Sequence, residues 1–459
     1  MAANRSFLIA TLAMNQTLFF EALGKVLEEG GHGVAYLCFH ERSHEYLASR
    51  GKRSFNAFGG EARTREIDLS AYAWPSLNLV LSHEKAVFEA YDSERLLRKL
   101  RGYLAACESA LDALAGTVPG PLVLLQELGG FLSNVASFYA ARRRGLDGIF
   151  MEPSFFAGRV FFTRNGFAAP QVQGPRSAAA SDAVAAYLDE AVARQRVVIP
   201  LKDAHHYRGP MRKLTDLRHM RRLIEKTVDK HLLGKGEEFS HIGGHVARHA
   251  RMLVNSRLLA RHYDAMPDEG RRFVYYPLHV PADVALTIRS PQYVDQLALV
   301  DFLARSVPQT HEVLIKEHPA LVGALERRRL TDLLRRRDNV RLLDPAIKNY
   351  QVLQRAEAVI TVNSKSGAEA LLLGRPVLVL GDAFYSPCEL VHRVDSLAEL
   401  PRRLAEMLRS ARGPEPGAVR RYFQDVWNAS WPGELHVAAD ANAQALAASL
   451  LAYLEHEHS

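Results

Sequence analysis

Residues 358–373 read AVITVNSKSGAEALLL, a short apolar run followed by small polar residues and a helix-forming segment. The run 358–362 has the length and the β-branched content of a buried strand. Ser366 and Glu369 have the spacing of a capping box, which satisfies the first free amides of a helix. Gly367 would let a ligand approach the backbone, and the positive end of the helix dipole favours a phosphate there. The segment therefore predicts a strand, a turn and a helix N-terminus that together bind an anion.

A second apolar run ends in a similar way, at Lys316, His318 and Pro319. Short apolar runs recur from residue 271 onward and are separated by helical stretches. These runs are Phe273–Tyr276, Glu312–Ile315, Val340–Leu343, Ala358–Val362 and Pro376–Leu380. Such alternation predicts a doubly wound parallel-sheet domain over residues 271–413. We expect Lys316 and His318 to join the helix N-terminus at residues 364–367 in one anion site.

The first part of the chain shows the same alternation. Its strand-like runs are Phe7–Leu12, Val34–Phe39, Leu122–Leu125 and Gly148–Met151, with helical patterns at Leu18–Leu27 and Val135–Arg144. They predict a second α/β domain over residues 1–175. Residues 176–270 are mostly charged helix formers, apart from the run Val197–Ile199, and residues 414–459 form helices that we expect to pack back on the N-terminal domain. Two such domains would face each other across a ligand cleft.

The composition is that of a globular protein, with 48% hydrophobic and 24% charged residues, which excludes a disordered chain. Cys38, Cys107 and Cys388 are too few and too widely spaced for a disulfide framework or a CxxC metal pair. The uncharged stretch Ser6–Phe20 is interrupted by two polar amides, and we interpret it as a buried strand leading into a helix. No segment reaches the length of a bilayer span, so we expect a cytoplasmic protein.

The net charge of +7 is concentrated in one block. Residues Lys202–Arg272 hold 16 Lys and Arg against 9 Asp and Glu, together with 8 of the 19 histidines. The block fits either a solvated helical face or an anionic membrane surface, while its few aromatics and the absence of nucleic-acid motifs argue against nucleic acid. His241, His245 and His249 have the spacing of one helical face. Gly243-Gly244 interrupts that helix and no carboxylate completes the set, so we predict no metal site.

Missing motifs narrow the class of reaction. The chain has no Asp-x-Asp triplet, no GxxxxGK[ST], no GxGxxG after a strand and no GxSxG. The absence of these motifs argues against an NTPase, a Rossmann oxidoreductase or an α/β-hydrolase. Preorganised ammonium, imidazole and amide donors stabilise the charge on a departing nucleotide without a metal. The residues therefore fit an anion site that could stabilise a departing nucleotide when a sugar–phosphate bond breaks.

Several segments of the second domain follow one another in a recognisable order. They are Tyr275–His279 with Asp283, Leu314–Pro319, Val362–Leu371, Gly374–Val377, Gly381–Tyr385 and His392. In these segments the chain resembles the capsule polysaccharide biosynthesis family of GT-B glycosyltransferases, the bacterial capsule β-Kdo transferases, most clearly over residues 274–393. The segments Gln126–Asn134, Arg142–Gly145 and Phe150–Glu152 resemble its acceptor-side loop, helix and strand end. His279 stands where the family usually has Gln, and Cys388–Val391 replaces its Gly-Leu-Thr.

The resemblance implies a GT-B-like fold of two doubly wound parallel-sheet domains, a helical basic insert and C-terminal return helices. It also implies CMP-Kdo as donor, a lipid-linked or polysaccharide acceptor, transfer with retention and no metal. The nucleotide would be bound by Lys316, His318, Pro319, Asn363, Ser364, Ser366, Gly367 and Glu369. The catalytic candidates are Glu152, which would face the acceptor, Asp283 and His318, and the acceptor-side candidates are Gly129, Gly130 and Asn134.

Other functions remain open from the residues alone. A CDP-glycerol or CDP-ribitol donor needs the same anion site. A GT-B-shaped nucleotide-sugar 2-epimerase shares the architecture but would use two or more carboxylates in the cleft. A non-catalytic scaffold of capsule assembly is a third class. For the transferase, we expect the basic block 202–272 to hold the enzyme at anionic lipid on the inner face of the inner membrane.

Overall fold

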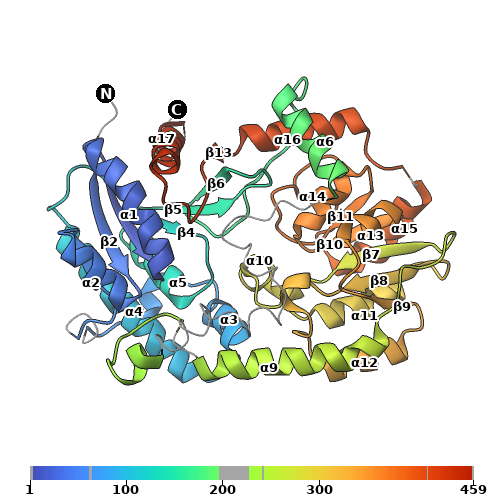
Figure 1. Cartoon of the computed structure of the whole chain (residues 1–459), viewed down its shortest axis with the longest axis horizontal. Helices are drawn as coiled ribbons and strands as arrows, with labels where there is room; N and C mark the ends of the chain where they lie inside the picture. Colours follow the sequence, from blue (N-terminus) through green and yellow to red (C-terminus); the bar gives the residue numbers. More distant parts are fainter. Residues whose placement is uncertain (1–3, 61–64, 196–226, 240–241, 411, 457–459) are drawn as a thin grey trace.

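Two β-sheets, one for each half of the chain, carry the fold (Figure 1). The computed structural model describes residues 4–60, 65–195, 227–239, 242–410 and 412–456. Helices cover both faces of each sheet, which is the doubly wound arrangement predicted from the sequence. Together with helices at the end of the chain that bridge the two halves, this is a GT-B-like architecture.

The first sheet has the strand order β13-β6-β5-β4-β1-β2-β3. Its strands are β1 (Ser6–Thr11), β2 (Gly33–Cys38), β3 (Ser54–Asn56), β4 (Leu122–Glu127), β5 (Asp147–Pro153), β6 (Arg159–Arg164) and β13 (Trp431–Pro432). Strands β1 to β5 are parallel, β6 pairs antiparallel with β5, and β13 in turn pairs antiparallel with β6 at the edge. The predicted parallel sheet is thus extended at one edge by two antiparallel pairings, which the sequence did not predict. The turn between β5 and β6 is too short for a crossover, so β6 can only return antiparallel.

Alternate residues of the first sheet face two different helical layers. In β1, Phe7 and Ile9 belong to the core under α1 (Met14–Glu29) and α17 (Asp440–His456). Leu8 and Ala10 belong to the opposite core. That core also contains residues of α3 (Leu77–Phe88), α4 (Ser93–Leu114) and α5 (Leu132–Arg143). Both faces of β1 are buried, which explains its uninterrupted apolar sequence.

The second sheet is parallel throughout, in the order β12-β11-β10-β7-β8-β9. Its strands are β7 (Phe273–Pro277), β8 (Glu312–Lys316), β9 (Val340–Leu343), β10 (Ala358–Thr361), β11 (Val377–Val379) and β12 (His392–Arg393). One face packs on α11 (Gln296–Ser306), α12 (Arg327–Arg336) and α15 (Leu400–Ser410). The other packs on α13 (Asn349–Arg355), α14 (Lys365–Leu372) and α16 (Pro416–Asn428).

Further helices and 3-10 turns complete the described part of the fold. They are α2 (Glu41–Ser49), α6 (Asp182–Ala193), α9 (Ile242–Leu259), α10 (Val284–Thr287) and the 3-10 turns η2 (Leu69–Tyr72), η4 (Ala260–His262), η5 (Pro291–Tyr293), η6 (Pro319–Leu321) and η7 (Leu397–Glu399). At the end of the chain, α16 packs against α6 and α14, β13 extends the first sheet and α17 packs against α1. The run Val197–Ile199 and residues 202–226 of the basic block lie outside the described residues.

The three cysteines form no disulfide framework, as the sequence predicted. Cys38, Cys107 and Cys388 are all buried and form no disulfide. Within the described ranges, none of the helices has both the length and the apolar character that crossing a bilayer requires.

Candidate functional site

Lys316 is the last residue of β8 and lies at the carboxyl edge of the second sheet. Its side chain is buried, and its Nζ donates a hydrogen bond of 2.9 Å to the carbonyl oxygen of Ile347. Burial lowers the pKa of Lys316 to about 8, although the nearby charges of Glu369 and Asp344 raise it. The amine is therefore poorly hydrated and held among acceptors, a setting in which an added anion would stabilise its charged form.

Glu369 of α14 lies close enough to Lys316 for their charges to interact, and Asn349 connects it to two further polar groups. Asn349 Nδ2 donates to Glu369 Oε2 at 2.8 Å and to Ser366 Oγ at 3.0 Å, and Asn349 Oδ1 accepts from the Tyr275 hydroxyl at 2.9 Å. Burial raises the pKa of Glu369 to about 7, against this hydrogen bond and the charges of Lys365 and Lys316. We call these residues the Lys316–Glu369 network: Tyr275, Lys316, Asn349, Ser366 and Glu369. The network connects the ends of β7 and β8 to the helix after β10.

The N-terminus of α14 is capped by Ser364, whose Oγ accepts a hydrogen bond of 3.2 Å from the amide of Ser366. The predicted capping box of Ser366 and Glu369 is therefore wrong. Glu369 is only 2% exposed, and its carboxylate accepts a hydrogen bond from the side-chain amide of Asn349. A buried carboxylate requires such a partner, whereas the helix end is already capped by Ser364.

Gly367 also has a role different from the predicted one. A Cβ atom at this position would lie 2.3 Å from the hydroxyl oxygen of Tyr385. That hydroxyl donates to the carbonyl oxygen of Ser364. The missing side chain thus makes room for Tyr385, and the close approach predicted for a ligand is occupied by an aromatic ring of the protein.

Asn363 and His279 each bury a polar atom for which the described residues provide no hydrogen-bond partner, Asn363 Oδ1 and His279 Nε2. Asn363 Nδ2 donates to the carbonyl oxygen of Ala285 at 2.5 Å, which ties the turn after β10 to α10. Burial, together with the nearby charge of His318, lowers the pKa of His279 to about 3, so its imidazole is neutral. His318 itself is half-buried after β8, and Pro319 is exposed at the start of η6.

The acceptor-side candidates follow β4 in the first half of the molecule. Asn134 is 2% exposed, and its Nδ2 donates to the carbonyl oxygen of Glu127 at 3.2 Å. A Cβ atom on Gly129 would lie 2.6 Å from Asn134 Oδ1, and one on Gly130 would lie 2.5 Å from the ring of His83. Close packing within the protein accounts for both glycines and for the asparagine.

His83 of α3 brings the first half of the molecule into contact with α10 of the second. Its Nδ1 lies 2.7 Å from Thr287 Oγ1, and the hydroxyl of Ser82 donates to the carbonyl oxygen of Thr287 at 2.8 Å. Burial lowers the pKa of His83 to about 4. Asp283 caps the same short helix, with Oδ1 accepting from the amide of Ala285 at 2.9 Å. The structure thus gives this catalytic candidate a capping role.

Glu152, at the end of β5, forms a bidentate ion pair with Arg289, which follows α10. The Nη1 and Nη2 atoms of Arg289 lie 3.0 and 2.5 Å from the two carboxylate oxygens. The side chains are 7% exposed for Arg289 and 17% for Glu152. Burial lowers the pKa of Arg289, but the charge of Glu152 outweighs it and the net effect is a raised pKa. Because both carboxylate oxygens accept from Arg289, Glu152 is engaged as a charge partner in this arrangement and is not available as a base.

Two further contacts cross the same boundary. Lys365 Nζ donates to the carbonyl oxygen of Ser154 at 3.1 Å, and Asp382 accepts from the amide of Ala169 at 2.7 Å and from Gln171 Nε2 at 2.9 Å. With Glu152 and Arg289 they form what we call the interdomain seam. Arg289 could not be predicted from the sequence, because a single arginine after a short helix matches no motif and only the fold shows its partner.

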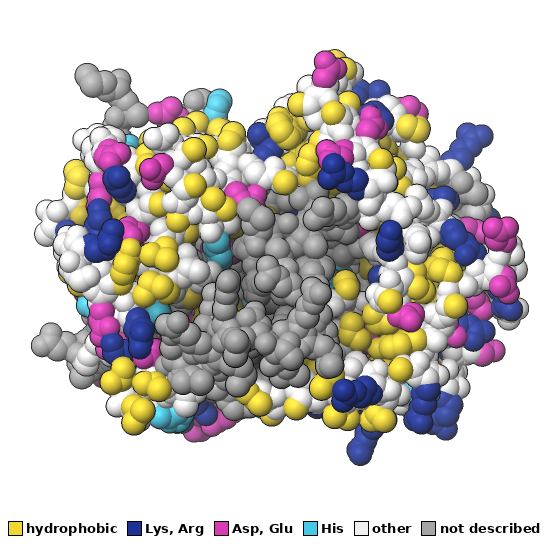
Figure 2. Space-filling model, viewed as in Figure 1, with side chains coloured by type: hydrophobic (Ala, Val, Ile, Leu, Met, Phe, Trp, Pro, Cys, Tyr) yellow, Lys and Arg dark blue, Asp and Glu magenta, His cyan; other side chains and the backbone are white. Residues whose placement is uncertain are grey.

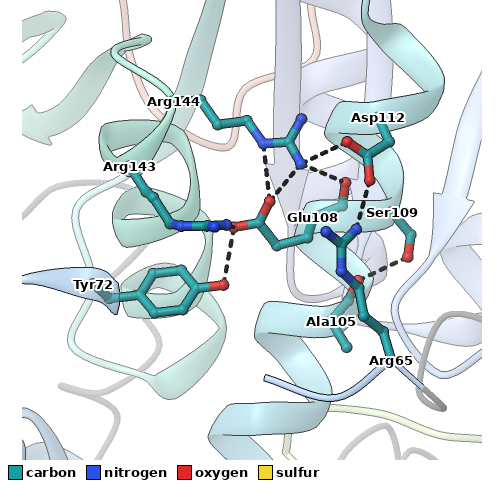
Figure 3. A network of polar contacts seen from close by, with 8 residues as sticks. All are labelled: Arg65, Tyr72, Ala105, Glu108, Ser109, Asp112, Arg143 and Arg144. Carbon is teal, nitrogen blue, oxygen red and sulfur yellow. Dashed lines mark hydrogen bonds and ion pairs between the residues drawn. The ribbon is translucent and has the colours of Figure 1, made fainter. Parts of the chain in front are cut away.

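The basic segment Arg142–Gly145 was grouped by resemblance with the acceptor side, but two of its arginines bind a buried carboxylate (Figure 3). Arg143 Nη1 and Arg144 Nε each lie 2.9 Å from Glu108, which is 0% exposed, and Tyr72 donates to the same carboxylate at 2.9 Å. These contacts hold α5 against α4 and explain the arginines as structural residues.

The histidine series of the insert cannot be placed as a set. His241 and the side chain of His245 lie outside the described residues. Over the residues that are described, no group of three or more His, Cys, Asp or Glu side chains is placed to bind a metal ion.

Comparisons with known proteins point to the second half of the chain. The family described as capsule polysaccharide biosynthesis protein matches residues 231–390. Protein FixF of Sinorhizobium fredii is 31% identical over 160 residues, which are 34% of this chain and 37% of that protein. The match thus spans little more than a third of either protein.

Among solved structures, the β-Kdo 2,7 transferase part of KpsC from Thermosulfurimonas dismutans is 15% identical, with a TM-score of 0.36 over 76% of this chain and 89% of that one. The β-Kdo 2,4 transferase part of the same protein is 13% identical, with a TM-score of 0.29 over 64% of this chain and 79% of that one. These TM-scores are low, and the architecture above rests on the two sheets themselves. The matched residues 231–390 contain β7 to β11 and the Lys316–Glu369 network, so the similarity to the capsule polysaccharide biosynthesis family includes this part of the second half.

Proposed function

We propose that the protein is a metal-independent glycosyltransferase of capsule or surface polysaccharide synthesis. It transfers a sugar, with retention, from a nucleotide donor to a lipid-linked or glycan acceptor, and the donor is CMP-Kdo. The observation that carries this proposal is the Lys316–Glu369 network at the carboxyl edge of the second sheet, within the segment that matches the family. Ligands of open α/β sheets bind at this edge.

The donor phosphate is bound, in this proposal, between the Lys316 amine and the N-terminus of α14. Lys316 exchanges its hydrogen bond to the Ile347 carbonyl for one to the phosphate, which restores the charged form that burial disfavours. The imidazole of His318 adds a donor from the neighbouring loop. These groups neutralise the charge that develops on the departing nucleotide.

One buried lysine and one helix N-terminus suit a single phosphate group better than a diphosphate, which supports a nucleoside monophosphate as the leaving group. The interdomain seam brings Glu152 to the same edge from the acceptor half. Release of Glu152 from Arg289 on acceptor binding would give the reaction a carboxylate beside the sugar. A lipid-linked acceptor would bring the enzyme to the inner face of the cytoplasmic membrane.

The first experiment compares the thermal stabilisation of the protein by CMP, CDP and UDP. We expect CMP to raise the melting temperature most, and Lys316→Met to remove most of that rise. The matched control is Lys25→Met, since Lys25 is exposed on α1 and far from the network in the fold. Stronger stabilisation by CDP would point to a CDP-glycerol or CDP-ribitol donor, and stronger stabilisation by UDP would contradict the proposal.

The second experiment follows the fate of the donor. Incubation with CMP-Kdo and a glycolipid acceptor should release CMP and extend the acceptor. Incubation of nucleotide sugars without an acceptor should give only slow hydrolysis, whereas a new nucleotide-sugar isomer would identify an epimerase.

A further inference from the structure

The helix α9 contacts both halves of the molecule through one of its faces. Arg248 Nη1 donates to the carbonyl oxygen of Val87 at 2.8 Å, and Arg251 forms an ion pair with Glu89, both in the first half. Toward the second half, Asn255 Nδ2 donates to the carbonyl oxygen of Gly323 at 3.1 Å. α9 is thereby fixed along the lower edge of the molecule, below both sheets (Figure 1).

The opposite face of α9 is exposed and largely aliphatic. Val246, Val254 and Leu258 are 54%, 51% and 42% exposed. Exposed residues follow the helical period along this face: Ala247, Ala250, Val254, Leu258 and, in the 3-10 turn that extends the helix, Arg261. Within the described ranges, none of the hydrogen bonds and ion pairs that hold α9 in the fold uses these side chains, so their apolar surface could contact another partner.

The charged side chains of the α9 segment itself are all basic. Residues 239–263 contain four arginines and no aspartate or glutamate. Arg257 is exposed beside Leu258, and the described part of the chain offers it no ion-pair partner. A helix that presents aliphatic side chains together with unneutralised arginines matches the interfacial helices that lie on anionic bilayers.

Neighbouring segments add large apolar side chains to the same region. Tyr91 is 74% exposed and lies near Arg251. Leu232 and Leu233, 78% and 55% exposed, belong to the segment 227–239, which also follows the lower edge in Figure 1. In the space-filling view, apolar side chains reach the surface along this edge (Figure 2).

We propose that the outer face of α9, with Tyr91, Leu232 and Leu233, is a docking surface for an anionic lipid bilayer. The aliphatic and aromatic side chains enter the interface, and Arg257 and Arg261 bind phosphate groups of the lipids. The surface extends the proposed function, because it would bring a lipid-linked acceptor to the enzyme, but its test needs no sugar.

The test is co-sedimentation of the full chain with vesicles of phosphatidylcholine alone or with about 30 mol% phosphatidylglycerol. We expect binding only to the anionic vesicles, and weaker binding at high salt. The double variants Val254→Ser/Leu258→Ser and Arg257→Gln/Arg261→Gln should each lower the partition coefficient by about tenfold. The double variant Leu18→Ser/Lys25→Gln, which removes an exposed leucine and lysine from α1, is the matched control and should bind like the wild type.

Thermal stabilisation of each variant by CMP separates this proposal from the proposed function. Lost vesicle binding with intact CMP stabilisation supports the docking surface. Equal binding to neutral and anionic vesicles, or wild-type binding by both α9 variants, would overturn it. Self-association that the same substitutions abolish would assign the face to a second copy of the chain and would also overturn the lipid proposal.

Discussion

At the scale of single residues, burial sets the protonation of the two charged members of the Lys316–Glu369 network. Lys316 is 5% exposed and Glu369 is 2% exposed, so each ion loses most of its hydration. The pKa of the amine is lowered to about 8 and that of the carboxyl is raised to about 7. The two pKa values are shifted in opposite directions and both come close to neutral pH. The protonation of each group can therefore be tested by a pH series.

For Lys316, we predict that the affinity for CMP falls as the pH rises through about 8. The proton that makes the amine a cation is lost there, while bound phosphate favours the protonated form. The dissociation constant should increase by up to about tenfold per pH unit above this point. Calorimetric titration between pH 6.5 and 9.5 measures it. In Lys316→Arg the side chain stays charged, so a steep loss of affinity that persists in that variant would remove Lys316 as the cause.

For Glu369, we predict that Glu369→Gln removes a pH-dependent loss of stability. The folded-state pKa of about 7 lies above the unfolded value of about 4.5, so the native protein holds the proton more tightly. The resulting stability is complete below pH 4.5 and is lost as the pH rises through 7, at a cost of about 3 kcal/mol. Urea unfolding at pH 5 and pH 8 compares wild type with variant. The same change in both proteins between the two pH values would contradict the assignment.

At the scale of elements, three contacts fix the position of α14 after the turn that follows β10. Ser364 caps the helix, Tyr385 fills the space beside Gly367, and Asn363 ties the turn to α10. These contacts orient the amides at the start of α14 without using the side chain of Glu369, which is left for the network.

The cap predicts a clear difference between two serines. Ser364→Ala removes the acceptor for the Ser366 amide and should cost about 1 kcal/mol of the free energy of unfolding. Ser366→Ala keeps that amide bonded to Ser364 and should cost less, because Asn349 retains its bond to Glu369. Parallel urea titrations measure both. A larger loss for Ser366→Ala would place the cap at residue 366 after all.

At the scale of the whole molecule, buried charges join the two halves. The seam pairs Glu152 of the first sheet with Arg289 of the second half, across 137 residues of sequence. A second buried carboxylate, Glu238, fixes the segment 227–239 to α4 of the first half, where it accepts from Lys99 at 3.0 Å and from the Tyr103 hydroxyl at 2.5 Å. Burial raises the pKa of Glu238 to about 7. Such ion pairs specify the relative position of the halves more than they add stability.

The seam predicts that Arg289→Met destabilises the protein by about 3 kcal/mol, because it leaves the Glu152 carboxylate buried without its cation. The double variant Glu152→Gln/Arg289→Met should recover a large part of this loss, since the stranded charge is gone. Chemical unfolding followed by the fluorescence of tryptophan measures the two free energies. Additive losses in the double variant would show that the two side chains do not act as a pair.

Much of the fold followed from local sequence pattern. The predicted runs became β1, β2, β4, β5 and β7 to β11, because length, apolar content and the spacing of Gly and Pro reflect forces that act within one element. The short edge strands β3, β12 and β13 escaped prediction, because two or three residues carry too little pattern. β6 was not predicted although it has six residues. It pairs with β5 through a short turn that carries no recognisable turn motif.

Lys316 and Glu369 could be singled out in advance, because they stand where parallel strands and the following helix meet at one edge. Their shared partner Asn349 could not, since it belongs to a different helix and matches no motif. The same limit applies to Gly367, which the sequence pattern marked, and to Glu152, which the resemblance marked. Their partners Tyr385 and Arg289 determine what each residue does, and only the fold shows them. Element order is a local property of the amino-acid sequence, whereas the partner of a buried polar group depends on which surfaces the folded chain brings together.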